Sequence, residues 1–565
     1  MKLRELHIIL SVLTSLLLVA CVATTKASNT YEADIIVYGG TSGAVTSAIQ
    51  SAREGKTVIL VSPDKHLGAM SSSGLTYTDS GKAFTIGGVS REFYRRIYKY
   101  YQDPKACNWL KLEDDSLSGQ DVKAIKHDDK TMWIFEPKVA ERIYNEWLAE
   151  EKNITVFKEK LLNRKNGVNK DGTKIVSIRT LDGDVFKGKV FIDATFEGDL
   201  MASSGCSYHV GREANSVYNE KWNGAQPTVL HHDHYFYKDT DPFKIKGDKS
   251  SGLMKYISEK HPGIKGQGDK KIQAYCFRLC MSIIPENMRP FPKPKNYNAD
   301  DYLLVLRVWE MEKRRDTMKP DRIPNGKTDT NNKSAFSFDF IGENYAYPEA
   351  SYEERAKIVE SHKNYQQGLL YFIMNDPRVD SELRSFYAPY GLAKDEFVDN
   401  DNWPYNLYIR EARRMIGEYV MTEHDCTTTK DTPKSIGMGS YTLDSHNCQR
   451  YITAQGFVQN EGDIGVKLKK PYKISYGSLT PKRNEVSNLL VPIACSASHI
   501  AYGSIRMEPV FMLLGHSSAT AAAIAIDSNC AVQDVDYAKL RKKLLADGQI
   551  LEWDNPTPTI KKSKR

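Results

Sequence analysis

Cysteine, net charge and long apolar runs are all scarce in this sequence. The chain has nine cysteines in 565 residues, and no two have the spacing of a zinc site; Cys276 and Cys280 come closest. A disulfide framework and a cysteine-based metal site are therefore excluded. Apolar residues make up 41% and charged residues 26% of the chain, which excludes a disordered, collagen-like or polytopic membrane protein. The net charge of +7 is spread along the chain and gives no indication of nucleic-acid binding.

The first 21 residues have the pattern of an export leader. Lys2 and Arg4 form a basic start, and the apolar stretch 7–20 is shorter than the about 20 residues that a membrane span needs. The stretch ends in Leu18-Val19-Ala20-Cys21, which resembles a bacterial lipobox. We predict a lipoprotein signal peptide over residues 1–21 and a lipid on Cys21, with ordinary cleavage after Ala27 as the alternative. Both predict an exported protein, and the lipid predicts a periplasmic, outer-membrane or cell-surface lipoprotein.

A nucleotide-binding unit follows the leader. The apolar run 34–38 predicts a buried strand, the turn 39–43 is rich in glycine, small residues at helical spacing predict a helix over 44–52, and 57–61 predicts a second strand. A strand, glycine turn, helix and strand within about thirty residues form the dinucleotide-binding βαβ unit. Backbone N–H groups of such a turn approach a pyrophosphate, and the helix N-terminus favours its negative charge.

The glycine fingerprint of this unit is imperfect. Counted back from Gly43, its three glycine positions fall on Tyr38, Gly40 and Gly43. The acidic residue expected at the end of the second strand is Ser62, and Asp64 follows two residues later. The cofactor contacts predicted in this unit are Gly39, Gly40, Thr41, Ser42, Gly43 and Ser62.

Further segments, together with this unit, carry a resemblance to a known family. They are 37–43, 66–70, 73–75, 87–94, 135–137, 192–199, 211–213, 408–414, 444–446, 496–499, 506–509 and 514–516. The sequence resembles the FAD-dependent oxidoreductases often labelled "xanthan lyase-like", over nearly the whole mature chain. The resemblance implies FAD as cofactor and a glutathione-reductase-like fold. It also implies that the inserted middle of the chain covers the flavin.

The fold class that follows is α/β, a discontinuous Rossmann-like FAD-binding domain with an inserted α+β substrate domain. We expect the FAD-binding domain over 33–205 and again over 436–530, the inserted domain over 206–435, and a C-terminal extension with a basic tail over 531–565. Local patterns also predict helices over 135–150 and 352–371 and a hairpin over 167–187.

The resemblance implies further contacts to FAD outside the first unit. They are His66, Gly68 and Met70 after the second strand, Asp193, Thr195 and Asp199 after a later strand, and Gly515 and Ser518 near the C-terminus. For His66, loop packing is the alternative. For Asp199, the alternative is an N-cap of a short helix over 200–204. The Ala-rich stretch 515–526 predicts a last helix that opens at Gly515 and points its N-terminus at the flavin. Ala519 stands where the family usually has glycine.

Four residues are candidates for the chemistry. Oxidation of an alcohol or amine by a flavin needs a base for the proton and a cation or dipole that stabilises the reduced flavin. His499 is the first candidate base, with a buried, hydrogen-bonded structural role as the alternative, and His446 is the second candidate. Arg506 either holds a substrate carboxylate or pairs with Glu508.

Two charged clusters have simpler interpretations. His231-His232-Asp233-His234 resembles a set of metal ligands, and a strand would put His232 and His234 on one face. The sequence reveals no further ligands, so we predict no metal site. The arginines of 410–414 predict one helix with a solvated or salt-bridged face, and a position of Arg410 facing the pocket is the alternative.

Three functions compete. The first is an extracytoplasmic FAD-dependent oxidoreductase that transfers hydride from a small polar substrate to flavin N5; the family association favours a carbohydrate or derivative. Oxygen, a quinone or a carrier protein would accept the electrons. The second is redox-neutral, flavin-assisted cleavage or isomerisation of a sugar. The third is a glycan-binding surface lipoprotein without catalysis, supported only by Tyr38, Ser62 and Ala519.

Overall fold

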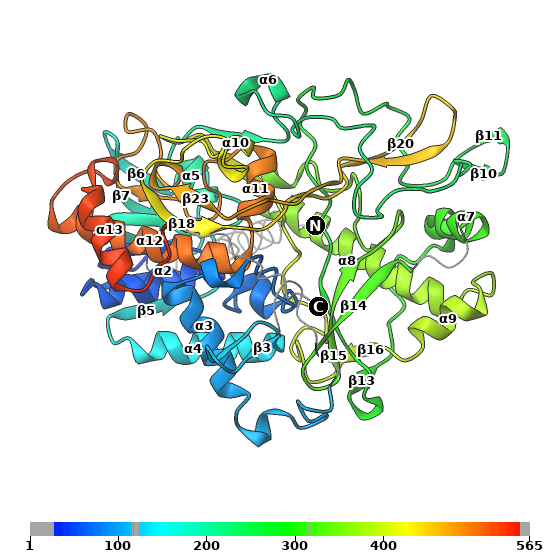
Figure 1. Ribbon diagram of the computed structural model, residues 1–565, viewed down its shortest axis with the longest axis horizontal. Coiled ribbons are helices and arrows are strands. Elements are labelled where there is room, and N and C mark those ends of the chain that lie inside the picture. The colour runs from blue at the N-terminus through cyan, green and yellow to red at the C-terminus, as the bar shows by residue number, and fades with distance from the viewer. Residues whose placement is uncertain (1–27, 116, 118–123, 313–315, 554–565) are drawn as a thin grey trace, which may run out of the picture.

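The structure of the protein, a computed structural model, describes residues 28–115, 117, 124–312 and 316–553. The predicted leader and Cys21 lie outside the described residues, and so does 554–565. Figure 1 shows two parts beside each other. The N-terminal (blue to teal) and C-terminal (dark orange and red) segments build most of the left part. The green middle of the chain builds most of the right part, where the gold β20 (Gln449–Ile452) also lies. Segments from both ends of the sequence therefore fold together.

The left part contains a seven-stranded sheet in the order β5-β2-β1-β8-β7-β6, in which β24 also pairs with β8. The strands are β1 (Thr30–Tyr38), β2 (Val58–Val61), β5 (Ile154–Phe157), β6 (Val168–Asp171), β7 (Lys174–Arg179), β8 (Val185–Asp193) and β24 (Leu489–Leu490). β5, β2, β1, β8 and β24 run parallel. Their carboxyl ends meet at one edge, where sheets of this kind bind ligands. The strands predicted over 34–38 and 57–61 are confirmed as β1 and β2.

Both faces of the parallel strands are buried. In β1, Ile35 and Val37 belong to the core beneath the helices, whereas Ile36 and Tyr38 belong to a second core on the opposite face. Alternate side chains of a strand point to opposite faces, so a strand covered on both sides reads as one continuous apolar run. This is why 35–38 is apolar throughout.

Helices cover one face of this sheet. They are α2 (Ser42–Arg53), α3 (Gly88–Tyr100), α4 (Pro137–Glu150), α12 (Glu508–Asp527) and α13 (Tyr537–Ala546), and α11 (His499–Ile505) precedes α12. α12 lies along α2 and α3. It is long and apolar enough to cross a membrane, but 94% of its apolar stretch is buried inside the protein, as expected of a core helix.

The start of α12 differs from the prediction. The helix begins at Glu508, with Pro509 in its first turn, and not at Gly515. Gly515 lies where α12 crosses α2: a Cβ there would be 2.3 Å from the carbonyl oxygen of Gly43 and 2.6 Å from Oγ1 of Thr46. The predicted start is wrong because this glycine serves the close approach of two helices and does not mark a helix end.

The right part is built around a five-stranded antiparallel sheet in the order β13-β16-β12-β15-β14. Its strands are β12 (Leu279–Ser282), β13 (Met288–Arg289), β14 (Met318–Ile323), β15 (Lys327–Asn332) and β16 (Gly391–Ala393), and its helices are α7 (Leu303–Met311), α8 (Tyr352–Asn375) and α9 (Ser381–Tyr387). Ser351 and Glu354 form a capping box that starts α8. The helix predicted over 352–371 is therefore confirmed.

A buried ion cluster joins the two parts. Lys327, at the start of β15, is fully buried, and its Nζ lies 2.7 Å from Glu136, 2.6 Å from Glu396 and 2.8 Å from Asp395. Glu136 is the N-cap residue of α4 in the left part. Removing one partner of such a cluster leaves an uncompensated buried charge, which costs about 3–5 kcal/mol. The cluster therefore holds the antiparallel sheet in place against α4.

The run of arginines at 410–414 is not helical. β17 (Arg413–Met415) pairs with β9 (Tyr208–Val210), and Arg410 and Arg414 are almost completely buried. The predicted helix is wrong, whereas the salt-bridged alternative to a solvated face fits. Arg413 and Arg414 pair with carboxylates that are distant in the sequence, and Arg414 also contacts the nearby Glu411. Arg414 contacts Glu213 at 2.6 Å, for example. The local pattern does not show such partners.

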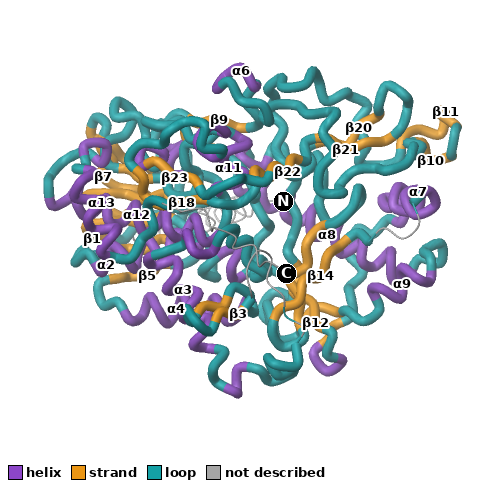
Figure 2. Tube along the Cα trace, in the orientation of Figure 1, coloured by secondary structure: helices purple, strands orange, loops and turns teal. Residues whose placement is uncertain are grey.

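Short two-stranded pairs and loops complete the fold, and Figure 2 shows that loops dominate its upper right. The pairs are β3 (Ile125–Lys126) with β4 (Thr131–Met132), β10 (Phe243–Ile245) with β11 (Asp248–Leu253), β18 (Ser435–Gly439) with β23 (Tyr472–Ser475), β19 (Leu443–Ser445) with β22 (Ile464–Val466), and β20 (Gln449–Ile452) with β21 (Val458–Glu461). The remaining helices are α5 (Asp199–Ser203), α6 (Asn215–Tyr218) and α10 (Glu423–Cys426).

Other local predictions are confirmed with small changes. The helix over 135–150 is α4, which begins at Pro137, and the hairpin over 167–187 is β6, β7 and the start of β8. The short helix after Asp199 is α5, but its N-cap is Gly198 in the left-handed conformation. Asp199 is therefore the first residue of the helix, and its interpretation as the N-cap is wrong.

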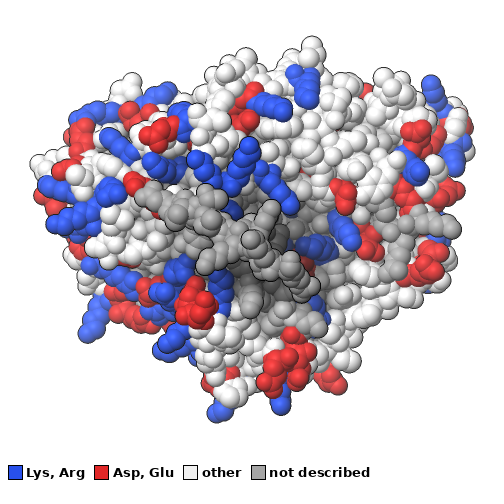
Figure 3. Space-filling model, viewed as in Figure 1, with Lys and Arg blue, Asp and Glu red and all other residues white. Residues whose placement is uncertain are grey.

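The state of the cysteines and the distribution of surface charge agree with what the composition predicts. The eight cysteines in the described part of the chain are all free, and most of them are buried. Acidic and basic side chains are interspersed over most of the face shown in Figure 3, as the small net charge implies.

At the crossing of α2 and α12, helix propensity and packing predict opposite effects of a glycine substitution on stability. Helix propensity alone predicts that Gly515→Ala stabilises the protein by about 1 kcal/mol. Because the added Cβ would lie 2.3 Å from the carbonyl oxygen of Gly43, we expect instead that the free energy of unfolding falls by about 1–3 kcal/mol. Denaturant unfolding of both proteins measures the difference, and a stabilised variant would contradict this packing.

Candidate functional site

The glycine turn lies at the carboxyl edge of the parallel strands. Gly39 has φ +139°, and a Cβ on it would lie 2.3 Å from the carbonyl oxygen of Ala194, so no side chain fits there. Thr41 caps α2 by accepting a hydrogen bond from Ala44 N, and its hydroxyl donates to Ala194 O at 2.8 Å. The first N–H groups of α2 have no intrahelical partner. Such N–H groups can bind a pyrophosphate.

A cavity of about 300 Å³ opens beside this turn. Its walls come from the ends of β1, β2 and β8, from α8, and from the segment 405–409. The lining residues are Tyr38, Gly40, Thr41, Pro63, Asp64, Ala69, Leu161, Thr195, Phe196, Glu197, Asp199, Tyr347, Tyr352, Arg355, Ala356, Val359, Tyr405, Asn406, Leu407 and Ile409. Tyr38, at the first glycine position of the fingerprint, is part of this wall, and its hydroxyl accepts a hydrogen bond from Leu162 N.

Asp64 takes the position at which dinucleotide folds bind ribose hydroxyls. A Cβ on Gly40 would lie 2.5 Å from Oγ of Ser62 and 3.0 Å from Oδ2 of Asp64, so both side chains face the turn. Ser62 is bound locally, because its hydroxyl donates to the carbonyl of Asp64. Burial, and then the nearby Glu197, raise the pKa of Asp64 to about 7. A ligand that donates hydroxyl hydrogens would satisfy this carboxyl.

The segment after β8 is held by its own side chains. Asp193 accepts hydrogen bonds from Thr195 N at 3.1 Å, from the Thr195 hydroxyl at 2.7 Å and from Met201 N at 2.7 Å. Burial raises the pKa of Asp193 to about 6. Both carboxyl oxygens of Asp193 are therefore used to shape the loop. Thr195 lines the cavity, whereas Asp193 positions it.

Asp199 is surrounded by arginines. It contacts Arg355 of α8 at 2.6 Å, Arg413 of β17 at 2.8 Å and Arg164 at 3.3 Å. Its pKa is lowered despite its burial, because Arg355 donates to it and the other guanidinium groups are close. The predicted hydrogen bonds from Asp199 to a ribityl or ribose hydroxyl compete with three cations. Arg355 also lines the cavity and adds a positive charge beside the dinucleotide site.

The loop after β2 lies against the glycine turn. Gly68 N donates to Gly40 O at 2.8 Å, Gly68 has φ +101°, and Met70 is fully buried. His66 points elsewhere. Its Nδ1 lies 2.8 Å from Glu141, its Nε2 lies 3.2 Å from Asp399, and its ring stacks on Tyr405. This geometry favours loop packing for His66 over contact with a cofactor.

Glu508 connects three elements near this turn. It is the first residue of α12 and accepts hydrogen bonds from Ser42 of α2 at 2.5 Å and from Ser71 at 2.9 Å. Burial raises its pKa to about 7, although both serines lower it. Among the described residues these hydroxyls are its hydrogen-bond partners, so the predicted Arg506–Glu508 pair is wrong. Glu508 is held too close to the serines to reach Arg506.

Gly515 and Ser518, predicted to contact the flavin at the N-terminus of the last helix, lie in the interior of α12. Gly515 is about 10 Å from the helix start at a rise of 1.5 Å per residue. Both residues are buried against other parts of the protein. The dipole argument therefore applies to Met507 and Glu508, where the helix begins, and not to Gly515 and Ser518.

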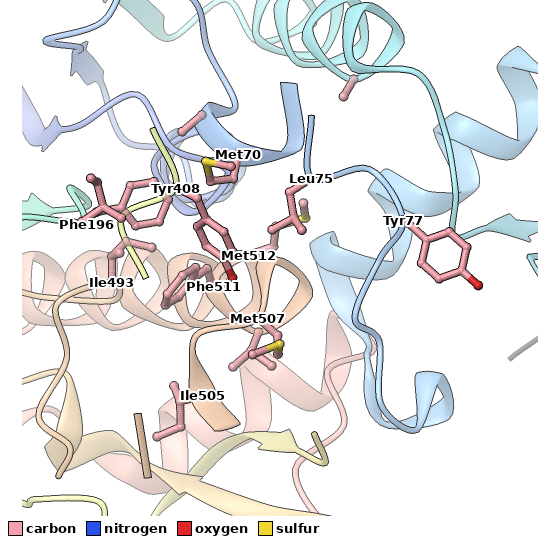
Figure 4. Close-up of a cluster of buried hydrophobic side chains, with 14 of the residues drawn as sticks. Met70, Leu75, Tyr77, Phe196, Tyr408, Ile493, Ile505, Met507, Phe511 and Met512 are labelled. Atoms are coloured by element: carbon pink, nitrogen blue, oxygen red, sulfur yellow. The ribbon is translucent and has the colours of Figure 1, made fainter. Parts of the chain in front are cut away.

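An apolar cluster lies in front of the start of α12. Figure 4 shows Tyr408 between Met70 and the residues Phe511 and Met512 of α12. The Tyr408 hydroxyl accepts a hydrogen bond from Arg506 at 2.7 Å, and Arg506 also contacts Asp444 at 2.5 Å. Apolar side chains that could pack against a flat ring such as a flavin therefore lie next to the largely buried charged pair of Arg506 and Asp444.

His446 belongs to that charged group. Its Nδ1 lies 2.7 Å from Asp339, and its Nε2 lies 3.8 Å from Asp444, the partner of Arg506. Burial, and then Arg410, lower the pKa of His446 to about 4. The pKa of Asp339 is lowered despite burial, because Arg410 and His446 stabilise its anion. An ionised Asp339 requires the proton on Nδ1, which leaves the Nε2 lone pair available.

His499 lies in a different network. It begins α11, is 1% exposed, and its Nδ1 lies 2.8 Å from Glu411. Glu411 also accepts hydrogen bonds from Gln273 and Arg414. Its pKa is about 2 despite burial, because His499 and Arg414 stabilise the anion. The surroundings of His499 are a buried ionic network, in keeping with the structural interpretation of this residue.

Three residues of this site escaped the sequence reasoning. Asp64 carried a signal, because it is the acidic residue nearest to the end of the second strand, but the count placed Ser62 there. Asp339 and Arg355 carried none, since each lies far along the chain from its partner. His446 contacts Asp339 across 107 positions, and Arg355 contacts Asp199 across 156.

The parallel sheet, the glycine turn capped by Thr41 and the cavity at its edge define a dinucleotide-binding protein of the flavoprotein class. The free N–H groups, Asp64 and the apolar cluster fit the pyrophosphate, ribose and ring of FAD. The sequence model of a family described as FAD dependent oxidoreductase matches residues 34–544, and the chain belongs to this family. It is thus an FAD-dependent oxidoreductase.

Solved structures show distant similarity. A geranylgeranyl bacteriochlorophyll reductase-like protein from Thermoplasma acidophilum is 11% identical over 92% of this chain and 84% of that one, with a TM-score of 0.33. PqsL, a probable FAD-dependent monooxygenase from Pseudomonas aeruginosa, is 14% identical over 29% of this chain and 42% of that one, with a TM-score of 0.19. This chain thus spans about two fifths of PqsL. No curated protein sequence matches significantly.

The position of Asp64 predicts its effect on cofactor affinity. Because a carboxylate that accepts ribose hydroxyls makes strong hydrogen bonds, we expect Asp64→Ala to weaken FAD binding by about tenfold, equivalent to about 1.4 kcal/mol. Quenching of flavin fluorescence during titration of the apoprotein measures the dissociation constant. Lys65→Ala is the control, since Lys65 is adjacent but 59% exposed. Equal affinities for Asp64→Ala and the wild type would remove Asp64 from the site.

Proposed function

We propose that this protein is an extracytoplasmic, lipid-anchored FAD-dependent oxidoreductase that oxidises a hydroxyl group of a sugar or sugar acid. The pair formed by Asp339 and His446, beside the start of α12, is the observation that carries the proposal. It supplies a neutral, oriented imidazole next to the place where the flavin ring fits. The middle of the chain, which contributes Asp339, would then act as the substrate part.

His446 is the better base of the two candidate histidines. Its Nδ1 is fixed by Asp339 at 2.7 Å, so Nε2 is the basic nitrogen. The lowered pKa keeps this nitrogen unprotonated at neutral pH. His499 is held by Glu411 within a saturated ionic network and begins a different helix. His446 is also connected to the apolar cluster: it lies near Asp444, Asp444 contacts Arg506, and Arg506 donates to Tyr408.

Oxidation of a secondary alcohol removes a proton from oxygen and a hydride from carbon. FAD, when bound, would supply the acceptor for this hydride. His446 Nε2 takes the proton, and Asp339 stabilises the imidazolium that forms. Arg506 and the Tyr408 hydroxyl hold the substrate oxygen with hydrogen bonds. The product is a carbonyl compound, and the two electrons leave with the hydride.

An outer pocket supports an anionic sugar as the substrate. A cavity of about 420 Å³ is lined by Lys82, Lys126 and Lys467, together with the hydroxyls of Ser440 and Thr442. Tyr441, between these two residues, donates to Asp79 at 3.2 Å. Ammonium and hydroxyl groups recognise carboxylates and sugar hydroxyls, which favours uronic acids within the carbohydrate class.

Replacement of His446 tests the assignment of the base. General-base catalysis contributes about 10²–10⁴-fold to rates, so we expect His446→Ala to slow anaerobic flavin reduction by at least about 100-fold while FAD stays bound. A panel of neutral sugars, uronic acids and amino sugars identifies the substrate by bleaching of the wild-type flavin. If His499→Gln abolishes reduction and His446→Ala does not, the base is His499.

The pH dependence gives a second measurement on the same base. The folded pKa of His446 lies at about 4, below the usual value of 6.5, so the base form is present above about pH 4. We therefore expect kcat/KM for the identified sugar to show no histidine limb between pH 5 and 8. A limb near pH 6.5 that disappears in His446→Ala would contradict the lowered pKa.

The proposed location rests on the leader and Cys21. Replacement of the lipid-bearing thiol removes the anchor, so we expect Cys21→Ser to move the protein from the membrane fraction to the soluble fraction of its native host. Intact-mass analysis of the wild type would show a diacylglycerol on Cys21 at the new N-terminus. A mature protein that begins after Ala27 would support ordinary cleavage and overturn the anchor.

A further inference from the structure

The histidine-rich segment 231–234 forms a turn that is hydrogen-bonded to β22 and to residues at the β20–β21 pair. The Nδ1 of His231 accepts a hydrogen bond from Gly465 N at 2.8 Å. The carbonyl of His234 accepts from the side-chain amides of Asn447 at 2.9 Å and Asn460 at 2.8 Å. The segment is not a strand, because His232 and Asp233 have φ of +52° and +61°. Even so, this turn brings His232 and His234 to the same side.

Asp463, which directly precedes β22, faces both histidines. Its Oδ1 lies 3.0 Å from Nδ1 of His232 and 3.6 Å from Nδ1 of His234. One ligand atom from each of the three side chains lies within 4.8 Å of the other two. Ligand atoms around a tetrahedral metal at about 2.0–2.1 Å are separated by distances of this size.

The protein leaves polar atoms of this group unsatisfied. Asp463 is 4% exposed, and neither its Oδ2 nor the buried Nδ1 of His234 has a hydrogen-bond partner within the described residues. Buried polar atoms in folded proteins are nearly always paired, so such atoms need an explanation. A cation held between them would satisfy both.

The surroundings provide access and a second layer of contacts. His232 is 34% exposed at its side chain, which leaves a path for an ion and a position for water. A Cβ on Gly465 would lie 2.1 Å from Nε2 of His232, so glycine makes room for the ring. Nε2 of His232 lies 3.9 Å from Asp444, the carboxylate that contacts Arg506. The group therefore adjoins the candidate substrate site.

We propose that His232, His234 and Asp463 bind one divalent transition-metal ion, with water in the fourth position. Two imidazoles and one carboxylate suit Zn²⁺ or Co²⁺ and do not suit Mg²⁺ or Ca²⁺, which prefer oxygen ligands alone. Three protein ligands with an open position are typical of sites that also contact a substrate. The ion would add positive charge beside Asp444 and Arg506.

Direct binding measurements test the site on untagged, FAD-loaded protein. We expect equilibrium dialysis against ZnCl₂ or CoCl₂, followed by elemental analysis, to find one ion per chain. His234→Ala and Asp463→Asn should each weaken the affinity by at least tenfold. His261→Ala is the matched control, because His261 is exposed and lies outside the group, and it should bind as the wild type does.

A spectroscopic measurement on the wild type does not depend on variants. Bound Co²⁺ with nitrogen and oxygen ligands should give visible d–d bands at longer wavelengths than the flavin absorption, and added Zn²⁺ should remove them. Flavin absorbance and thermal unfolding of the metal-free variants establish that they fold. A wild type that retains no ion, or a His261→Ala variant that loses binding equally, overturns the site. These readouts do not involve flavin reduction, so they are independent of the proposed oxidation.

Discussion

The crossing of α2 and α12 is the contact on which the site depends. Gly43 and Gly515 let the two helices approach until a single Cβ on Gly515 would meet the carbonyl of Gly43. Beside this crossing, Glu508 accepts a hydrogen bond from Ser42 across 466 positions of the sequence. Because α2 begins at the glycine turn and α12 begins at the apolar cluster, this contact sets the two ends of the candidate FAD site relative to each other.

Buried charge connects the middle of the chain to this framework. Lys327 among three carboxylates, Arg355 on Asp199, and Arg414 on Glu213 each join segments that are distant in the sequence. Such pairs contribute little net stability compared with apolar packing, but losing one partner is costly. They therefore specify where elements from the middle of the chain lie against the parallel sheet and its helices.

The elements whose signals are local could be predicted. The βαβ unit, α4, the β6–β7 hairpin and α8 follow from periodicity, proline and capping residues within a few positions. The start of α12 could not be predicted, because a glycine that allows two helices to pack closely has the same local pattern as a glycine at a helix end. The structure of 410–414 could not be predicted either, because buried arginines have the same local pattern as arginines on a solvated helix face. Both errors concern groups whose main partners lie far away in the sequence, such as Asp339 for Arg410 and Gly43 for Gly515.

The sequence by itself determined the dinucleotide-binding unit, because the glycine turn and the strands around it are contiguous and their physics is local. FAD as the dinucleotide followed from the resemblance to a family, which many segments carry together. It also contained the histidines, without deciding their roles. Only the tertiary structure decided that His446 has an orienting carboxylate, that His499 lies in an ionic network, and that Asp463 faces His232 and His234. The physical reason is that a side chain's protonation and ligands depend on neighbours in space, which folding supplies from distant segments.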